Sequence, residues 1–439
     1  MPLLRIRRAL LSAMLLLSVA TPALADDVPA NPTDFIVGVG THLFNRQRSV
    51  QVPFRLIREA GIRSVRDDAF WSTVEQQPGV LQASPDWLKY LREQHASNLG
   101  NVLVLDYGNQ FYARDSKPIT PTVRAGYARF VNYVANKLKG QVSFYEVYNE
   151  WDLEDPVSPG FSDAYLDLVR ATSKQLRNID PSARILAGAV TNEGIKGGFA
   201  DRLVQGGVLK YADGLSLHPY VHCQKTNEGN TPEAWIGWLR EVSARFDKTA
   251  GQTVPLYLTE MSWHSTGNLH PCGIDESTQA AWLARAYLLA KTLPAIKGLW
   301  WYDLSNDGTD PAEQEDNFGL VRQDLSPKAA YWVLKRLAPV LNEYRYVPAK
   351  PLPAAGSGDL VQVEFRKGTD RLLAVWTQGP AGMTTVQTAG TVSGPVRVRT
   401  TEPGQAEDNA GATWACAAAG CSARLKVGAY PLLITLDNP

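Results

Sequence analysis

Short apolar segments that alternate with helical patterns constrain the fold of this 439-residue chain more than any other feature. Most of these segments are rich in Val, Ile, Leu and aromatic residues, and several are almost continuously apolar, as strands buried on both faces should be. They lie at 35–40, 62–66, 101–106, 142–148, 185–190, 214–218, 256–260 and 298–303. Eight strands, each followed by a helix over about 310 residues, predict an α/β fold of the (β/α)8 barrel type.

The segments between these strands carry helix signals. The segment 122–138 is apolar at positions that fall on one face of a helix. Ser84 and Thr231 each precede a proline, which is typical of a helix start. Further helices are expected at 86–98, 162–178, 199–211, 233–248, 277–292 and 326–341. Two Rossmann-type halves are the alternative architecture, but no G-x-G-x-x-G sequence follows any of the strands.

The pattern changes after about residue 342, where alternating apolar residues replace the helical period. Strands are expected at 360–366, 371–377, 395–400 and 430–436, separated by turns that contain Gly and Pro. We therefore predict a barrel at 33–342 and a small all-β, sandwich-like domain at 343–439. Few aromatic residues lie there apart from Trp376 and Trp414. This scarcity favours a stabilising domain over a carbohydrate-binding module.

The N-terminal segment 1–25 has the pattern of an export signal. Three arginines lie within the first eight residues, an apolar run follows at 9–20, and Ala23-Leu24-Ala25 offers a cleavage site. The apolar run is short for a bilayer span, which needs about 20 residues. We expect a periplasmic or secreted protein; an uncleaved segment that tethers the chain to the inner membrane is the alternative.

Charge and cysteine content bound the partners and the compartment. The 44 basic and 44 acidic residues leave no net charge, which argues against a nucleic-acid partner. The four cysteines all follow the export signal, so two disulfides are expected in an oxidising compartment, with four free thiols as the alternative. The pairs would be Cys223 with Cys272 and Cys416 with Cys421. Neither pair has C-x-x-C spacing near a histidine, so no structural zinc site is predicted.

Two glutamates end predicted strands of the barrel. The fourth strand ends in Tyr148-Asn149-Glu150-Trp151, and the seventh continues through Glu260 to Trp263. In a (β/α)8 barrel, reactive side chains lie at the C-terminal ends of the strands, so both carboxylates should face one opening. Two such carboxylates can share catalysis: one protonates a leaving oxygen while the other attacks or activates water.

Other polar and aromatic residues at the strand ends fit a sugar site. Aromatic rings stack on the apolar faces of pyranoses, while polar side chains bind the hydroxyls. The expected substrate-binding residues are His42, Arg66, Tyr107, Asn149, Trp151, His218, Tyr220, Trp263 and Trp301. Aromatics at several strand ends indicate more than one subsite and hence endo action.

The order of these motifs resembles the clan A glycoside hydrolases, most closely family 39. The resemblance spans about residues 35–341 and includes Asn317-Phe318-Gly319-Leu320 ahead of Pro327-Lys328. It implies that Glu150 is the general acid/base and Glu260 the nucleophile. It also implies that Asn149 binds the sugar 2-hydroxyl and that Tyr220 donates to the nucleophile. Many clan members have proline where this chain has Trp151, a departure that changes the loop on the acid side.

The resemblance further implies the reaction and its setting. The expected enzyme is a retaining O-glycosyl hydrolase, so the two carboxyl groups should lie about 5–5.5 Å apart. It would act in the periplasm on a bacterial exopolysaccharide, as a monomer and without a metal or other cofactor.

Two other functions remain open at this stage. Metal-dependent hydrolysis would use His218, His222, His264 and His270, but Pro219 breaks any helix between the first two, and H-E-x-x-H is absent. A non-catalytic carbohydrate-binding or scaffold protein of a polysaccharide export machinery would use the same aromatic residues. Such a protein has no need of both glutamates.

Overall fold

The computed structural model describes residues 35–43, 50–114, 116–223, 229–348, 360–388, 396–405, 413–417 and 420–436. The predicted export segment 1–25 lies outside these residues. Within them, no helix combines the length and the apolar character needed to cross a bilayer.

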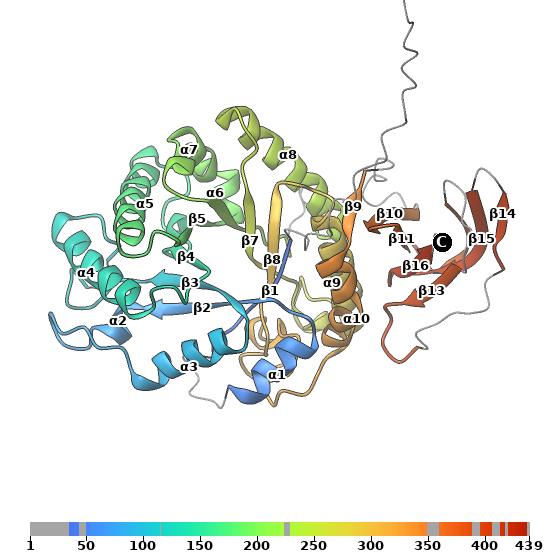
Figure 1. Ribbon diagram of the computed structural model, residues 1–439, viewed down its shortest axis with the longest axis horizontal. Coiled ribbons are helices and arrows are strands. Elements are labelled where there is room, and N and C mark those ends of the chain that lie inside the picture. The colour runs from blue at the N-terminus through green and yellow to red at the C-terminus, as the bar shows by residue number, and fades with distance from the viewer. Residues whose placement is uncertain are drawn as a thin grey trace, which may run out of the picture. The chain divides into compact units, whose positions relative to one another are not determined.

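The first eight strands close into a barrel of parallel neighbours in chain order, with β1 pairing to β8 (Figure 1). The predicted (β/α)8 barrel is therefore confirmed, and its strand boundaries shift by a few residues. The strands are β1 (Ile36–Gly40), β2 (Ser64–Phe70), β3 (Gly100–Asp106), β4 (Phe144–Val147), β5 (Arg184–Thr191), β6 (Gly214–His218), β7 (Leu256–Met261) and β8 (Ile296–Trp301).

Helices connect the strands and cover the barrel. They are α1 (Gln51–Glu59), α2 (Trp71–Val74), α3 (Pro85–Ala96), α4 (Pro121–Lys137), α5 (Pro159–Ile179), α6 (Asn192–Lys196), α7 (Phe199–Gln205), α8 (Pro232–Ala250), α9 (Glu276–Ala290) and α10 (Ala329–Glu343), with short 3-10 turns η1 (Trp151–Leu153), η2 (Val208–Lys210), η3 (Gly267–Leu269) and η4 (Glu315–Asn317). Ser84 and Thr231 cap α3 and α8 as predicted. The helix expected at 199–211 ends at Gln205, because two glycines follow and η2 takes up the rest. The sequence reading missed α1, α2 and α6.

A cluster of apolar side chains fills part of the barrel interior. Val102, Phe144, Leu186, Tyr257 and Trp300 form a separate buried cluster, contributed by five strands. We call this cluster the barrel floor. Gly38 makes room for it, because a Cβ at this position would lie 2.3 Å from the Trp300 ring.

The chain after α10 forms two antiparallel sheets that pack face to face. The larger sheet has the order β13-β16-β11-β10-β9 and the smaller one β12-β15-β14. Their strands are β9 (Arg345–Val347), β10 (Leu360–Lys367), β11 (Asp370–Thr377), β12 (Gly382–Gln387), β13 (Val396–Thr400), β14 (Ala415–Ala417), β15 (Gly420–Val427) and β16 (Leu432–Leu436). The sandwich-like fold is confirmed; β9, β12, β14 and β15 were not predicted.

Strand β11 is buried on both faces. Leu373 and Val375 belong to the core between the two sheets, while Leu372, Ala374 and Trp376 belong to the core shared with the barrel. This follows from the two-residue period of a strand. Both faces of the larger sheet are thus covered by protein at β11.

A hydrogen bond to a buried ion pair anchors this sheet to the barrel helices. Trp376 Nε1 donates to Glu233 Oε1 of α8 at 2.8 Å, and Glu233 also pairs with Arg285 of α9. Trp376 is fully buried and so presents no sugar-binding face, and Trp414 packs, partly buried, against the core between the sheets. This packing accords with a stabilising role for the domain.

Candidate active site

A register shift at the end of β7 aims two consecutive side chains at the barrel centre. The pairing of β7 with β8 is irregular between Leu258 and Met261. Thr259 donates to Glu146 of β4, and the next residue, Glu260, accepts from Arg66 of β2. Neither β4 nor β2 is a neighbour of β7, so both bonds cross the barrel interior. Such irregularities re-aim side chains at the rims of barrels.

The end of β4 positions the second glutamate through an unusual backbone. Tyr148 and Glu150 both adopt left-handed conformations, with φ of 64° and 46°. Non-glycine residues rarely adopt this conformation, and it is concentrated at functional sites. The turn leaves Glu150 partly exposed at the opening and starts η1 at the next residue.

His218, the last residue of β6, joins the two glutamates. Its Nδ1 lies 2.8 Å from Glu150 Oε1 and 3.6 Å from Glu260 Oε2. An oxygen of each glutamate and a nitrogen of His218 all lie within 4.8 Å of one another. The structure therefore brings Glu150 and Glu260 to one opening, as the sequence predicts.

The hydrogen-bond network fixes one proton of His218. The single O–H of Thr259 donates to Glu146 at 2.9 Å. Its oxygen, 3.1 Å from His218 Nε2, must therefore accept from an Nε2–H. The other ring nitrogen, Nδ1, lies 2.8 Å from Glu150 Oε1, so one proton on either atom would complete a hydrogen bond between them.

Arg66 is committed to three partners inside the barrel. Its Nε donates to Glu146 at 2.7 Å, one terminal nitrogen to Glu260 at 2.5 Å, and the other to Asn149 Oδ1 at 2.8 Å. The planar guanidinium suits such fixed, simultaneous contacts. It therefore orients both Glu260 and Asn149.

Glu260 is stabilised as a carboxylate. Burial alone would raise its pKa, but the nearby charges of His218 and Arg66, with the hydrogen bond from Tyr220, hold it below the usual value. Tyr220 OH donates to Glu260 Oε2 at 2.9 Å, as the resemblance implies. Burial alone would lower the pKa of His218, but the charge of Glu260 and the hydrogen bond with Glu150 raise it.

Three tryptophans expected to stack on sugar do not line the opening. Trp151, Trp263 and Trp301 are fully buried. Trp151 packs edge-on against Tyr148, its ring nitrogen bonded to the Phe161 carbonyl. The other two rings lie 6.4 Å apart and pack in the core. The prediction for these three residues was wrong, because strand ends also carry side chains that point outward to the helices.

Arg66 and His218 also differ from their expected role. Both are buried, and their polar atoms bond to the glutamates and their supporting residues, so they orient carboxylates and leave sugar hydroxyls to others. His42, Tyr107 and Asn149 keep partial exposure at the opening. Asn149 Nδ2 donates to the Tyr107 hydroxyl at 2.7 Å. Sugar binding by His42, Tyr107, Asn149 and Tyr220 stays a prediction.

Three charged residues lie beneath the opening, and Glu146 is the one among them that was missed from the sequence, because Asp68 and Asp106 lie at the ends of predicted strands. Glu146 supports Arg66 and Thr259, and Asp68 and Asp106 lie nearby. Burial raises the pKa of Asp68 to about 6, opposed by the charge of Arg66, and burial also raises the pKa of Asp106. A charged residue inside an apolar strand run was the available signal, since such a charge needs a partner.

Both predicted disulfides are present. Cys223, after β6, bonds to Cys272, in the segment after β7, with Cα atoms 4.9 Å apart. Cys416 and Cys421 are register partners on β14 and β15. The first disulfide ties together the segments that follow Tyr220 and Glu260.

Among the described residues three groups place potential metal ligands close together, and in one of them, Cys223, His270 and Cys272, the two sulfurs are already bonded to each other. The other two groups contain residues of the opening. Glu150, His218 and Glu260 form one, and His42, Asp303 and Asp307 form the other. In the first of these two groups Arg66 already supplies a positive charge to Glu260, and His218 has both ring nitrogens bonded. The arrangement is therefore that of two carboxylates with their proton and counter-charge supplied by protein.

Comparisons with known proteins agree with this geometry. No protein-family model and no curated protein matches the sequence. Among solved structures, a family 39 glycoside hydrolase from the gut symbiont Bacteroides cellulosilyticus WH2 matches with a TM-score of 0.73 and 23% identity, covering 92% of this chain and 81% of that one.

Two further structures match at lower identity. A monomeric beta-xylosidase from Caulobacter crescentus CB15 has a TM-score of 0.65 and 17% identity, over 93% of this chain and 97% of that one. A family 30 subfamily 8 xylanase from Clostridium acetobutylicum has a TM-score of 0.62 and 12% identity, over 93% and 97%. The chain thus has the fold of these glycoside hydrolases. The resemblance to family 39 is confirmed at the level of the fold.

Proposed function

We propose that this protein is a retaining glycoside hydrolase. The observation that carries the proposal is the meeting of Glu150 and Glu260 at one opening, with oxygens within 4.8 Å. Retaining enzymes hold their carboxyl groups about 5–5.5 Å apart, whereas inverting enzymes leave about 6.5–9.5 Å for a water. The fold of the structural neighbours supports the same reaction.

In the first step Glu260 attacks the anomeric carbon, and Glu150 gives its proton to the departing oxygen. Arg66 and Tyr220 hold Glu260 in line, and they keep it ionised before the attack. As the bond to Glu260 forms, negative charge leaves its carboxylate. The proton that Glu150 donates comes from the pair that it forms with His218.

In the second step Glu150 acts as the base. It takes a proton from a water that attacks the glycosyl-enzyme, so that the product keeps its anomeric configuration. The proton taken from this water replaces the one that Glu150 gave to the leaving oxygen, so the pair of Glu150 and His218 regains its proton and the cycle closes. Thr259 keeps the imidazole oriented through Nε2.

The proposed substrate is a bacterial exopolysaccharide that the enzyme cleaves internally. The proposed location is the periplasm or the outside of the cell, and the proposed state is a monomer. The support is the export-signal pattern at 1–25, the two disulfides and the partly exposed polar groups at the opening. A structural neighbour is itself described as monomeric.

The test uses the purified mature chain with a panel of polysaccharides: xylan, mannan, β-glucan and the exopolysaccharide of the source organism. Mass spectrometry identifies released oligosaccharides, and NMR follows the anomer that forms first. We expect retention of configuration. Glu150→Gln and Glu260→Gln should each abolish release, while the control Glu276→Gln, on the surface in a pair with Arg322, should keep it.

Inversion of configuration, or full activity in either glutamate variant, would refute the proposed mechanism. Binding of the polymer without any release of reducing ends would instead support the non-catalytic alternative. Thermal melting of each variant shows whether lost activity reflects lost folding.

A further inference from the structure

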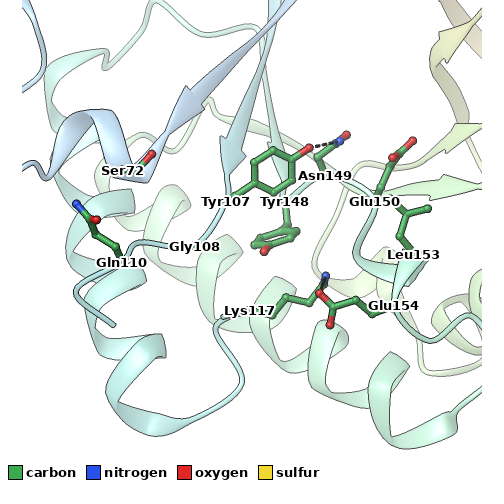
Figure 2. A pocket seen from close by; sticks show the side chains of 10 residues that line it. All are labelled: Ser72, Tyr107, Gly108, Gln110, Lys117, Tyr148, Asn149, Glu150, Leu153 and Glu154. Carbon is green, nitrogen blue, oxygen red and sulfur yellow. Dashed lines mark hydrogen bonds and ion pairs between the residues drawn. The ribbon is translucent and has the colours of Figure 1, made fainter. Parts of the chain in front are cut away.

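A pocket beside Glu150 is not used by the two catalytic steps. Its volume is about 650 Å³, and it is lined by residues that follow β2, β3 and β4. This size lies within the range of about 300–1,000 Å³ usual for ligand sites. Figure 2 shows Tyr107 and Asn149 on one side and Lys117 and Glu154 on the other. The part of the substrate that this pocket binds depends on which side of the cleaved bond the pocket lies.

The two glutamates give the pocket its direction. Glu150 lines it, and Glu260 does not. In the proposed mechanism the general acid lies beside the leaving oxygen, and the nucleophile lies on the opposite face of the sugar ring. Of the two carboxyl groups only that of the acid lines the pocket, so the pocket lies on the leaving-group side; Asn149, expected to bind the 2-hydroxyl of the attacked sugar, lines it as well. This step rests on the proposed function.

Lys117 and Glu154 give the pocket a paired donor and acceptor. Lys117 Nζ donates to Glu154 Oε1 at 2.6 Å, its only side-chain hydrogen bond among the described residues. An ammonium has three donors and a carboxylate has two acceptor oxygens, so both retain capacity for a ligand. Neighbouring hydroxyls of one sugar ring could be bound together, one accepting from Lys117 and one donating to Glu154.

The position of this pair is unusual for a surface ion pair. The Lys117 side chain is only 10% exposed, whereas that of Glu154 is 67% exposed. The ammonium lies 5.6–5.8 Å from the ring centroids of Tyr148, Trp151 and Phe161. These rings hold the lysine by cation–π attraction and fix it toward the pocket.

Apolar surface completes the pocket. Tyr107 and Leu153 are 42% and 63% exposed, which is high for large apolar residues. Such surfaces suit the apolar faces of a sugar ring. The Tyr107 ring is itself fixed, because it stacks on Phe70 and its hydroxyl bonds Asn149.

The wall after β3 is anchored from beneath. Asn109 is fully buried and donates to the Glu75 carbonyl at 2.9 Å, and the Glu75 carboxylate accepts from Trp71 and Tyr112. A buried polar network of this kind holds a loop in one conformation. Tyr107 and Gln110, on either side of Asn109, are therefore presented by a rigid support.

The charges of the pocket select among sugars. Lys117 is balanced by Glu154, and Glu150 adds a carboxyl group, so the lining carries no excess positive charge. A uronic acid placed here would meet carboxylates without a free counter-charge. The lining thus fits an uncharged sugar.

We propose that this pocket is the leaving-group subsite, which binds one uncharged, hydroxyl-rich sugar through Lys117, Glu154 and the exposed faces of Tyr107 and Leu153. It would account for cleavage within a chain, because the acid side then accepts a further sugar of the polymer.

The first experiment measures kcat/KM for two substrates of each variant: the oligosaccharide that the wild type cleaves best and the 4-nitrophenyl glycoside of its terminal sugar. Lys117→Met and Glu154→Gln keep side-chain size and remove the charge. We expect each to lower oligosaccharide cleavage by about 10-fold or more, since a hydrogen bond to a charged group is lost. The aryl glycoside has no leaving sugar, so the fold-decrease in its kcat/KM should be less than about a third of the decrease for the oligosaccharide.

The matched controls lie on another face. Lys335 pairs with Glu59 at 3.5 Å and lies 5.5 Å from the Trp332 ring, so Lys335→Met and Glu59→Gln make the same chemical changes. Both should behave as wild type, and thermal melting checks the folding of all four variants. Equal losses on the two substrates, or no loss on either, would overturn the subsite while the proposed hydrolysis stands.

A second measurement does not need turnover. In the Glu260→Gln background, calorimetry measures the affinity for xylohexaose, mannohexaose, cellohexaose and oligogalacturonate. We expect at least one neutral hexamer to bind more tightly than the acidic one and to lose about 10-fold on Lys117→Met. Two results would overturn the subsite even if the protein hydrolyses nothing: tighter binding of oligogalacturonate than of every neutral hexamer, or an affinity for the neutral hexamers that Lys117→Met leaves unchanged.

Discussion

The two glutamates at the opening occupy very different surroundings. Glu260 accepts from Arg66 and Tyr220 and lies near His218, and its side chain is 12% exposed. The side chain of Glu150 is 22% exposed, its polar partner at the opening is His218, and it follows a left-handed turn beside an open pocket.

This difference matches the two chemical roles that we propose for these glutamates. A nucleophile has to stay ionised and in line, and fixed donors achieve both. An acid that later becomes a base has to gain and lose a proton, so it needs a partner that can do the same. His218 is such a partner, whereas the guanidinium of Arg66 does not titrate in the physiological range.

The largest expected effect separates the two glutamates by leaving group. Glu260→Ala should lower kcat/KM on the order of 10⁴-fold or more with every substrate, because no covalent intermediate forms. Glu150→Ala should lower it by about 10²–10⁴-fold for sugar leaving groups but far less for 2,4-dinitrophenyl glycosides, which need no protonation. Steady-state kinetics on both substrates checks this.

Added azide sharpens the same test. With Glu150→Ala, azide should attack the glycosyl-enzyme and give a glycosyl azide of retained configuration. With Glu260→Ala, any azide product should have the opposite configuration, since azide replaces the nucleophile itself. The same product from both variants would break the proposed division of roles.

Tyr220→Phe should have the next largest effect. It removes the hydroxyl that donates to Glu260 at 2.9 Å. A hydrogen bond to a charged group contributes about 1.5–3 kcal/mol, which corresponds to a fall of roughly 10–100-fold in kcat/KM. The loss should appear in kcat/KM for aryl glycosides and oligosaccharides alike. Tyr430→Phe, which removes a bond to Ser277 in a distant region, should leave the kinetics unchanged.

His218→Asn tests the acid side through pH. The raised pKa of His218 means that its proton is lost only as the pH rises above the usual value of 6.5, so wild-type kcat/KM should fall on the alkaline side. The variant should lose this limb or shift it. His95→Asn, an exposed histidine of α3, should keep the wild-type profile.

The same substitution has a consequence for stability. A histidine whose pKa is raised on folding stabilises the protein fully below the unfolded pKa, and this contribution is lost as the pH rises through the folded value. The wild type should therefore melt at a higher temperature than His218→Asn by a margin that shrinks above pH 6.5. A constant margin would show that the buried imidazole is not protonated.

Much of the fold could be predicted from the sequence, because buried parallel strands are apolar runs and their helices carry caps such as Ser84 and Thr231. The positions of Glu150 and Glu260 followed from the rule on strand ends. The direction in which each side chain points did not follow from this rule. Glu260 lies near the end of β7 and Trp263 follows the strand by two residues, yet Trp263 packs against the helices and Glu260 faces the opening. The bulge in this part of β7 has no sequence signal.

The supporting residues were hidden for a related reason. Glu146 lies in an apolar run of β4, where a lone charge is visible, but its partners Arg66 and Thr259 come from strands that only the closed barrel brings near. Strand β12 was missed because only Val386 in it is buried. Strand β15 does alternate, with Cys421, Ala423, Leu425 and Val427 buried, so its signal was present in the sequence and was overlooked.

The smallest predicted effect on kcat/KM comes from removing a disulfide. It tests whether the segments that follow Tyr220 and Glu260 need the Cys223–Cys272 bond to keep their positions. Cys223–Cys272 spans 49 residues and follows Tyr220, whereas Cys416–Cys421 spans 5 residues in the β-sandwich. Loop entropy assigns them about 4 and about 2 kcal/mol of stability. Serine pairs at each site should lower the melting temperature in that order, and only the first should also reduce kcat/KM, by a few-fold. Equal kinetic effects would show that the site wall is rigid without its disulfide, since the β-sandwich bond lies in a different domain from both glutamates.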